Sequence, residues 1–338
     1  MQFTILSGVL SLALFLGGAQ STPAPTLPLP NKVIHQFPNG TWLENLAVRS
    51  NGEILLQLLD KPELHSLDPR TPASSKLIHT FAGYTSLLGI AEISHDVFVL
   101  VIGNLSINPV VVTPSSMGVW KVNFNRNKGK AAAVPEISKL ADVPEAGLLN
   151  GVTAISSAEV LIADSALGLV WKINTHTGKY EVVIQLPEMQ APAGGLGIGI
   201  NGVRASKGYL YWTNSVLQSL YRVKITKSGS LVPGAQPELL GNVGAVLDDF
   251  TLDYRGAWVT APFVNTVTLI SNSGKITTVA GELGSLNVAG GTSAAFGRGR
   301  DDKEILYVAT GGAQGAPVNG TVVEGGKVVK IDTRGFKI

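Results

Sequence analysis

The chain contains no cysteine. It therefore has no disulfide, no thiolate metal ligand and no cysteine nucleophile, and its stability must come from packing and from closure of the fold. Charged side chains are also scarce. They make up 15% of the 338 residues, with 26 basic and 24 acidic, whereas 45% of the residues are hydrophobic. This composition excludes a disordered chain. Basic blocks are absent, so we expect no nucleic acid partner.

One long hydrophobic run is present, at the start of the sequence. Residues 2–17 are apolar and are followed by small residues and then by a proline-rich stretch. The run is shorter than the roughly 20 residues that a membrane-spanning helix needs. It predicts a secretory signal peptide over residues 1–19, a linker over 20–31 and no membrane span afterwards, with an uncleaved anchor as the alternative. We expect a protein that is secreted or lies in the lumen of the secretory pathway.

Three N-x-S/T sequons agree with this compartment. They begin at Asn39, Asn104 and Asn319, each in turn-like sequence. Glycans attach to such asparagines where they are exposed in secreted proteins, so we predict glycosylation at these three positions.

Glycine and proline are abundant, with 39 and 18 residues, and they separate many short strand-like segments. One unit runs from Leu43 to Leu56 and turns at Asn51-Gly52. Closer and looser copies of this unit follow. In each of the six units we mark one residue as equivalent, and these marks are Glu44, Gly89, Asn150, Asn201, Asp249 and Thr292. Their spacing of about 43 to 61 residues is typical of a four-stranded propeller blade, and helical periodicity is almost absent. The longest repeat contains an insert around residues 104–116.

The sequence therefore predicts an all-β fold, a six-bladed β-propeller with four antiparallel strands per blade, over residues 32–338. A propeller leaves no bare sheet edge when its two ends pair in one blade. We expect residues 32–38 to add a strand beside Lys327–Ile331, so that the N-terminal strand closes the ring.

Four of the six marks carry side-chain oxygens. They are Glu44, Asn150, Asn201 and Asp249, and the innermost strands of a propeller surround its channel, so we expect them at one channel mouth. Two carboxylates and two amide oxygens suit a hard cation such as Ca²⁺ or Mg²⁺. The alternative is structural, because Asn-Gly and Asp-Asp are common in turns.

The repeat resembles the senescence-marker/gluconolactonase class of six-bladed propellers, above all at Asn150-Gly151-Val152 and at residues 160–164. The resemblance covers nearly the whole mature chain. It implies a divalent cation held by Glu44, Asn150, Asn201 and Asp249, the last doubling as a base.

Two segments depart from that class. Glu44 is followed by Asn45 and Leu46, where the class usually has Gly-Pro and an aromatic residue, and Asp249 is followed by Phe250, where it usually has Gly. A phenylalanine beside the mouth implies an apolar pocket instead of a sugar-lactone site.

With the signal peptide and the sequons, these departures resemble a fungal secreted subgroup that includes the hetero-Diels–Alderases of tropolone–sesquiterpenoid biosynthesis. The resemblance implies that an o-quinone methide forms from a hydroxymethyl tropolone or phenol and adds to a humulene-type alkene. Apolar small molecules are then the expected partners, and no cofactor is required. Polar groups at the ring would assist the loss of water. The aromatic residues we expect in the pocket wall are Trp42, Tyr84, Trp212, Phe250 and Phe263.

Two other functions stay open. One is a divalent-metal-dependent lactonase or esterase that uses Asp249 and a bound cation such as Ca²⁺. The other is a non-catalytic ligand-binding propeller. A His-dyad lactonase or Ser-His-Asp hydrolase is disfavoured, because none of the five histidines falls at a marked position.

Overall fold

The computed structural model describes residues 25–107, 110–125 and 134–338. The predicted signal peptide over residues 1–19 lies outside these ranges, as does the first part of the predicted linker. Within the described part of the chain, the helical structure is one short 3₁₀ turn, η1 (Pro187–Met189). No helix there is long and apolar enough to cross a membrane.

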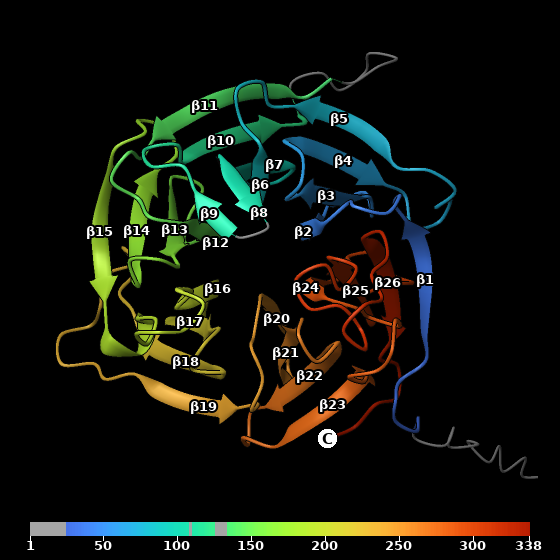
Figure 1. Ribbon diagram of the computed structural model, residues 1–338. Helices are drawn as coiled ribbons and strands as arrows, with labels where there is room; N and C mark the ends of the chain where they lie inside the picture. Colours follow the sequence, from blue (N-terminus) through green and yellow to red (C-terminus); the bar gives the residue numbers. More distant parts are fainter. Residues whose placement is uncertain (1–24, 108–109, 126–133) are drawn as a thin grey trace, which may run out of the picture.

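Six antiparallel sheets of four strands each surround a central axis (Figure 1). We number these blades in chain order and give their strands from the innermost to the outermost. Blade 1 contains β2 (Leu43–Val48), β3 (Ile54–Leu58), β4 (Glu63–Leu67) and β5 (Lys76–Thr80). Blade 2 contains β6 (Ser86–Ser94), β7 (Val97–Gly103), β10 (Gly118–Asn123) and β11 (Glu136–Asp142). Blade 3 contains β12 (Leu149–Ala154), β13 (Glu159–Asp164), β14 (Leu169–Asn174) and β15 (Tyr180–Gln185).

The second half of the chain repeats the pattern. Blade 4 contains β16 (Ile200–Ser206), β17 (Tyr209–Asn214), β18 (Ser219–Lys224) and β19 (Glu238–Asn242). Blade 5 contains β20 (Phe250–Leu252), β21 (Gly256–Ala261), β22 (Thr266–Ser271) and β23 (Ile276–Gly281). Blade 6 contains β24 (Gly291–Phe296), β25 (Ile305–Thr310), β26 (Lys327–Asp332) and β1 (Asn31–Gln36). The predicted six-bladed propeller is confirmed.

The two ends of the chain meet in blade 6. Strand β1 is antiparallel to β26, with Asn31 opposite Ile331 and Gln36 opposite Lys327. The strand begins one residue before the predicted boundary and ends at Gln36. Leu29, inside the predicted linker, is fully buried, and its N–H donates to the carbonyl of Val279 at 2.7 Å. The predicted closure by an N-terminal strand is thus present, and it also draws the end of the linker onto blade 5.

The middle strands are buried on both faces because each blade packs against two neighbours. In β13, Val160 and Ile162 join a core cluster with residues of blade 2, whereas Leu161 and Ala163 join a cluster with residues of blade 4. This split follows from the two-residue period of a strand, which sends successive side chains to opposite faces. Outer strands such as β5 have no fully buried residue. The buried apolar side chains therefore lie mainly in the contacts between blades.

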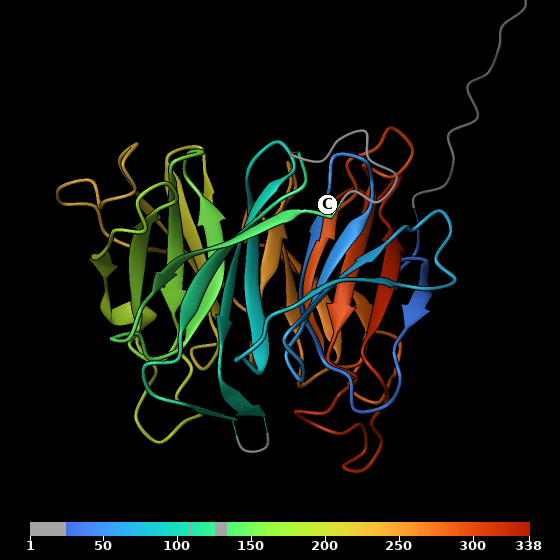
Figure 2. The ribbon, with the colours of Figure 1, turned by 90° about the horizontal axis from the view of Figure 1, so that it is seen from above.

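The insert in the second repeat forms a separate hairpin between β7 and β10. Its strands are β8 (Leu105–Ile107) and β9 (Val110–Val112). Figure 2 shows that this hairpin and the loop between β25 and β26 project from the same side of the disc. In Figure 1, β8 and β9 lie over the inner strands near the axis. These two projections raise the wall of the cavity described next.

Candidate functional site

The register of the inner strands shows which residues are equivalent in the six blades. Val152 on the inner strand of blade 3 pairs with Ile162. Val203 and Phe250 occupy the equivalent paired positions in blades 4 and 5. Counting back two residues from each gives the positions that face the channel mouth. They are Asn150 in blade 3, Asn201 in blade 4 and Asp248 in blade 5, while blades 1, 2 and 6 supply Glu44, Leu88 and Thr292.

This register changes two of the predicted equivalences. The structure places Asp248, and not Asp249, at the mouth position of blade 5, and Leu88 instead of Gly89 in blade 2. Glu44, Asn150 and Asn201 lie where the repeat predicted them.

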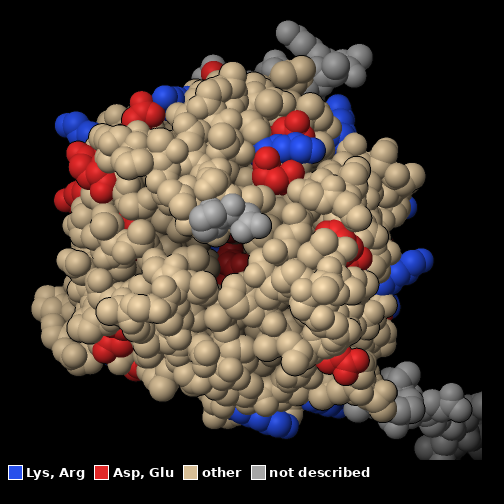
Figure 3. Space-filling view, viewed as in Figure 1, with Lys and Arg blue, Asp and Glu red and all other residues tan. Residues whose placement is uncertain are grey.

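A cavity of about 440 Å³ opens at this mouth. Figure 3 shows it as a hollow at the centre of the face, with acidic side chains inside and a surrounding surface of mostly uncharged residues. The volume lies in the range of pockets that enclose organic ligands. Among the described residues, the polar side chains that line the cavity are few: Glu44, Asn150, Asn201, Ser215, Asp248 and Gln314.

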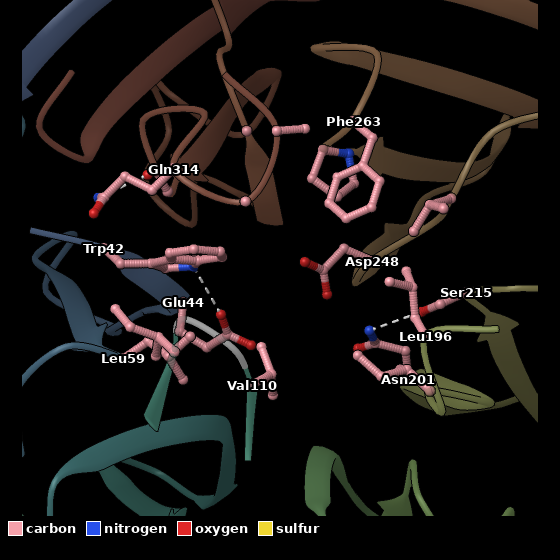
Figure 4. A pocket seen from close by; sticks show the side chains of 18 of the residues that line it. Trp42, Glu44, Leu59, Val110, Leu196, Asn201, Ser215, Asp248, Phe263 and Gln314 are labelled. Atoms are coloured by element: carbon pink, nitrogen blue, oxygen red, sulfur yellow. Dashed lines mark hydrogen bonds between the residues drawn. The ribbon is translucent and has the colours of Figure 1, made fainter. Parts of the chain in front are cut away.

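Glu44 and Asp248 approach the middle of the cavity from blades 1 and 5, and Asn201 lies beside Asp248 (Figure 4). The indole Nε1 of Trp42 donates to Glu44 Oε2 at 3.1 Å. Asn201 Nδ2 donates to Ser215 Oγ at 3.0 Å, while Asn201 Oδ1 is buried and has no partner among the described residues. The cavity is therefore lined by two carboxyl groups and by the side-chain amides of Asn150 and Asn201.

Burial governs the protonation of both carboxyl groups. It raises the pKa of Glu44 from 4.5 to about 7, against the hydrogen bond from Trp42 and with the help of the negative charge of Asp249. Burial, followed by the charges of Glu44 and Asp249, raises the pKa of Asp248 well above its ordinary value. Both effects disfavour the ionised form. Near neutral pH, Asp248 can thus hold a proton while Glu44 is ionised or shares that proton.

We predict that the folded protein becomes less stable as the pH rises from 5 to 8. The pKa of Glu44 is raised in the folded state, so its stabilising effect is complete below about pH 4.5 and is lost as the pH passes 7. The shift corresponds to at most about 3 kcal/mol. Glu44→Gln should flatten the dependence of the unfolding free energy on pH and make the protein more stable at pH 8. Urea unfolding at both pH values measures this, with exposed Glu282→Gln as the control; a wild-type profile unaltered by Glu44→Gln would contradict it.

Asp249 directly precedes β20, the inner strand of blade 5, and does not line the cavity. Its Oδ2 accepts hydrogen bonds from Arg204 at 2.9 Å, Asn45 at 3.1 Å and Ser293 at 3.2 Å. Its Oδ1 accepts the N–H of Phe250 at 2.8 Å. Asp249 is therefore the centre of a buried network beneath the cavity floor, which joins blades 1, 4, 5 and 6.

The predicted aromatic wall is present in part. Trp42 and Phe263 line the cavity. Trp212 is fully buried and stacks on Tyr221, with ring centroids 5.4 Å apart, and Phe250 is fully buried in a core cluster of blade 5.

Tyr84 does not line the cavity either, and its ring meets that of Trp120 edge-on in blade 2. The rest of the wall is aliphatic, and sequence reasoning missed it. Leu88, Leu105, Ile107, Val110, Leu196 and Ile198 are among the residues that form it.

The resemblance to metal-dependent propellers can be tested on the donor atoms. Glu44, Asn150, Asn201 and Asp248 offer two carboxylates and two amide oxygens, which are the donors that Ca²⁺ prefers. The set thus fits a hard cation by donor type. Among the described residues there is no group of three or more His, Cys, Asp or Glu side chains that could hold a metal ion.

The fold and the site define a six-bladed propeller with a largely apolar cavity at one channel mouth. A calcium-binding regucalcin of Agrobacterium tumefaciens has this fold. It is 16% identical, with a TM-score of 0.58, and the match covers 91% of this chain and 95% of that protein. No protein-family model matches the sequence.

Two curated relatives define the family more closely. A "Putative hetero-Diels-Alderase" of Phoma sp. is 30% identical over 85% of this chain and 89% of its own length. The "Putative hetero-Diels-Alderase asR5" of Sarocladium schorii is 32% identical over 94% of this chain and 87% of its own length. The chain belongs to this hetero-Diels–Alderase family, which confirms the predicted resemblance, and it is a biosynthetic enzyme of that kind.

Proposed function

We propose that the chain forms an o-quinone methide from a hydroxymethyl tropolone or phenol and joins it to a humulene-type alkene inside the channel-mouth cavity. The observation that carries this proposal is the placement of two carboxyl groups, Glu44 and Asp248, at the centre of a cavity whose wall is mostly aliphatic and aromatic. The family supplies the reaction type, and the cavity supplies groups suited to each of its two stages.

The first stage is the loss of water from the precursor. The Asp248 carboxyl donates its proton to the departing hydroxyl group of the CH₂OH substituent, and the C–O bond breaks. The ionised Glu44 accepts the proton of the ring hydroxyl, so one water is released and the ring becomes an o-quinone methide. Positioned acids and bases of this kind accelerate such steps by about 10² to 10⁴. The raised pKa of Asp248 keeps a proton available near neutral pH.

The second stage is the cycloaddition. The quinone methide contributes its carbonyl oxygen and its methylene carbon, and one C–O bond and one C–C bond form to the alkene. No proton moves in this step. The cavity therefore acts by holding two apolar reactants in contact and by excluding the water that would otherwise add to the intermediate.

We propose that this chemistry requires no cofactor. A cation held by Glu44, Asn150, Asn201 and Asp248 would supply positive charge to a ligand oxygen, which is the chemistry of the alternative lactonase or esterase. The aliphatic wall favours the cycloaddition, because a sugar lactone would leave its hydroxyl groups without partners against it.

Incubation of the wild-type protein with a hydroxymethyl tropolone and humulene tests the proposed function. We expect the cycloadduct to form with one stereochemistry, faster than in buffer, and at the same rate after EDTA treatment. The formation of only the water adduct would overturn the proposal. Hydrolysis of lactones that EDTA abolishes and Ca²⁺ restores would instead establish the alternative.

We also propose that the protein works in the secretory pathway or outside the cell, with apolar small molecules as its partners. Asn39 and Asn319 are exposed in turns, whereas Asn104 is partly buried and its Oδ1 is enclosed. We therefore predict glycans on Asn39 and Asn319 and none on Asn104. Expression in a fungal host, followed by endoglycosidase and mass spectrometry, checks this. A glycan on Asn104 would contradict it.

A further inference from the structure

The cavity wall has two chemically different halves. The two aromatic residues among the described lining residues, Trp42 and Phe263, come from blades 1 and 5, and between them lies the glycine-rich loop of blade 6. Most of the larger aliphatic side chains, including Leu105, Val110 and Ile198, come from blade 2 and from the segment that leads into blade 4, whereas Leu59 and Pro262 lie beside the two aromatic residues. Figure 4 shows Trp42 and Phe263 on one side, Val110 and Leu196 on another, and Asp248 between them.

The indole of Trp42 is held in one position by its neighbours. A methyl group added to Gly311 would lie 2.8 Å from Trp42 Cε2, and one added to Gly315 would lie 3.1 Å from Cη2. These glycines thus let the loop pack directly on the ring. The edge of the ring is fixed by the hydrogen bond from the indole Nε1 to Glu44. The backbone N–H of Trp42 donates to Asp60 Oδ1 at 2.8 Å.

Gly315 also brings the second aromatic ring into the same half. A methyl group on it would lie 3.4 Å from Phe263 Cε1 as well as close to Trp42. Two rings therefore border one side of the cavity next to the carboxyl pair. Aromatic side chains bind other π systems through stacked or edge-to-face contacts, whereas aliphatic side chains offer only apolar area.

From this division we propose two subsites, and the proposal rests on the function proposed above. The aromatic half binds the planar ring of the tropolone or phenol, with its oxygen atoms toward Glu44 and Asp248. The aliphatic half binds the medium-ring hydrocarbon alkene. Trp42 is then the residue that selects and orients the planar reactant, and the Leu, Ile and Val side chains select the alkene.

Binding of each reactant alone tests the subsites. Tropolone and humulene are each tested without the other reactant, so equilibrium dialysis measures the affinity of each ligand without any reaction. We expect Trp42→Leu to weaken tropolone binding about tenfold and to change humulene binding less than twofold. Ile198→Ala should do the opposite, with about tenfold weaker humulene binding. Trp42→Phe is the matched control, because it keeps a ring and should hold tropolone within about threefold of wild type.

Tryptophan fluorescence gives a second readout. Tropolone should quench the emission of the wild-type protein, and Trp42→Phe should remove most of that quenching, because the other four tryptophans, Trp120, Trp171, Trp212 and Trp258, do not line the cavity. Variants that weaken both ligands equally, or wild-type protein that binds neither, would overturn the two subsites. If the subsites behave as expected and wild type forms no cycloadduct, the proposed reaction fails and the subsite assignment stands.

Discussion

Replacement of Asp248 by Asn should lower the rate of cycloadduct formation from a hydroxymethyl precursor by about 10² to 10³. The amide has nearly the same shape and cannot give a proton to the departing hydroxyl group. The fold should survive, since Asp248 makes its contacts at the cavity floor and its ionised form is already disfavoured by burial. Product formation under single-turnover conditions, with unfolding measured in parallel, gives both quantities.

A precursor that needs no acid separates the two stages of the reaction. When the o-quinone methide is released photochemically in the presence of humulene, the Asp248→Asn variant should form the adduct within about threefold of the wild-type rate, because no proton moves in the cycloaddition. Full activity of Asp248→Asn with the hydroxymethyl precursor would refute its role as the acid. An equal loss with both precursors would show that Asp248 positions the reactants instead.

The sequence predicted the fold almost completely, because a propeller depends on features that a repeat shows directly. Alternating strands, turns such as Asn51-Gly52 and a regular spacing all follow from local chemistry. The closure of β1 on β26 was predictable too, since two chain ends must cover one open blade. These elements need no knowledge of how side chains meet across the channel.

The site was less predictable because a shift of one residue turns a strand side chain to the other side. Asp248 and Asp249 are adjacent acids, and the repeat alone gave the wrong one of them the cavity position. The hydrophobic residues could have shown which of the two acids faces the cavity. Phe250 pairs across its blade as Val152 and Val203 do, and the residue at the channel mouth lies two positions before each of them.

The aromatic wall shows a second limit. Phe250 directly follows a marked position and Trp212 lies in the same repeat as the marked Asn201, yet both side chains fill the space between blades, where large apolar side chains are most often buried. Much of the aliphatic wall comes from the β8–β9 hairpin and from the segment before β16. Such connections carry no repeat signal, so their approach to the axis depends on three-dimensional packing alone.

Removal of the Asp249 carboxylate should destabilise the protein by about 3 to 5 kcal/mol. The Asp249→Ala variant leaves the guanidinium of Arg204 without its carboxylate partner, although it still donates to the carbonyl of Val203, and breaks the hydrogen bonds from Asn45 and Ser293. The loss is costly because the ion pair is partly buried, with 23% of the Arg204 side chain exposed, and because the buried donors of Asn45 and Ser293 lose this acceptor as well.

Chemical denaturation measures the loss, with exposed Asp301→Ala as a control that should change the unfolding free energy by less than about 0.5 kcal/mol. The Asp249→Ala substitution also removes a negative charge that raises the pKa of Glu44, so the fall in stability with rising pH should be smaller and should end at a lower pH in this variant; an unchanged profile would show that the charge does not reach the cavity. A shift to lower pH is the expected result: without the charge, Glu44 ionises more easily. Adjacent acids would then have separate roles, with Asp248 acting on the ligand and Asp249 joining four blades beneath it.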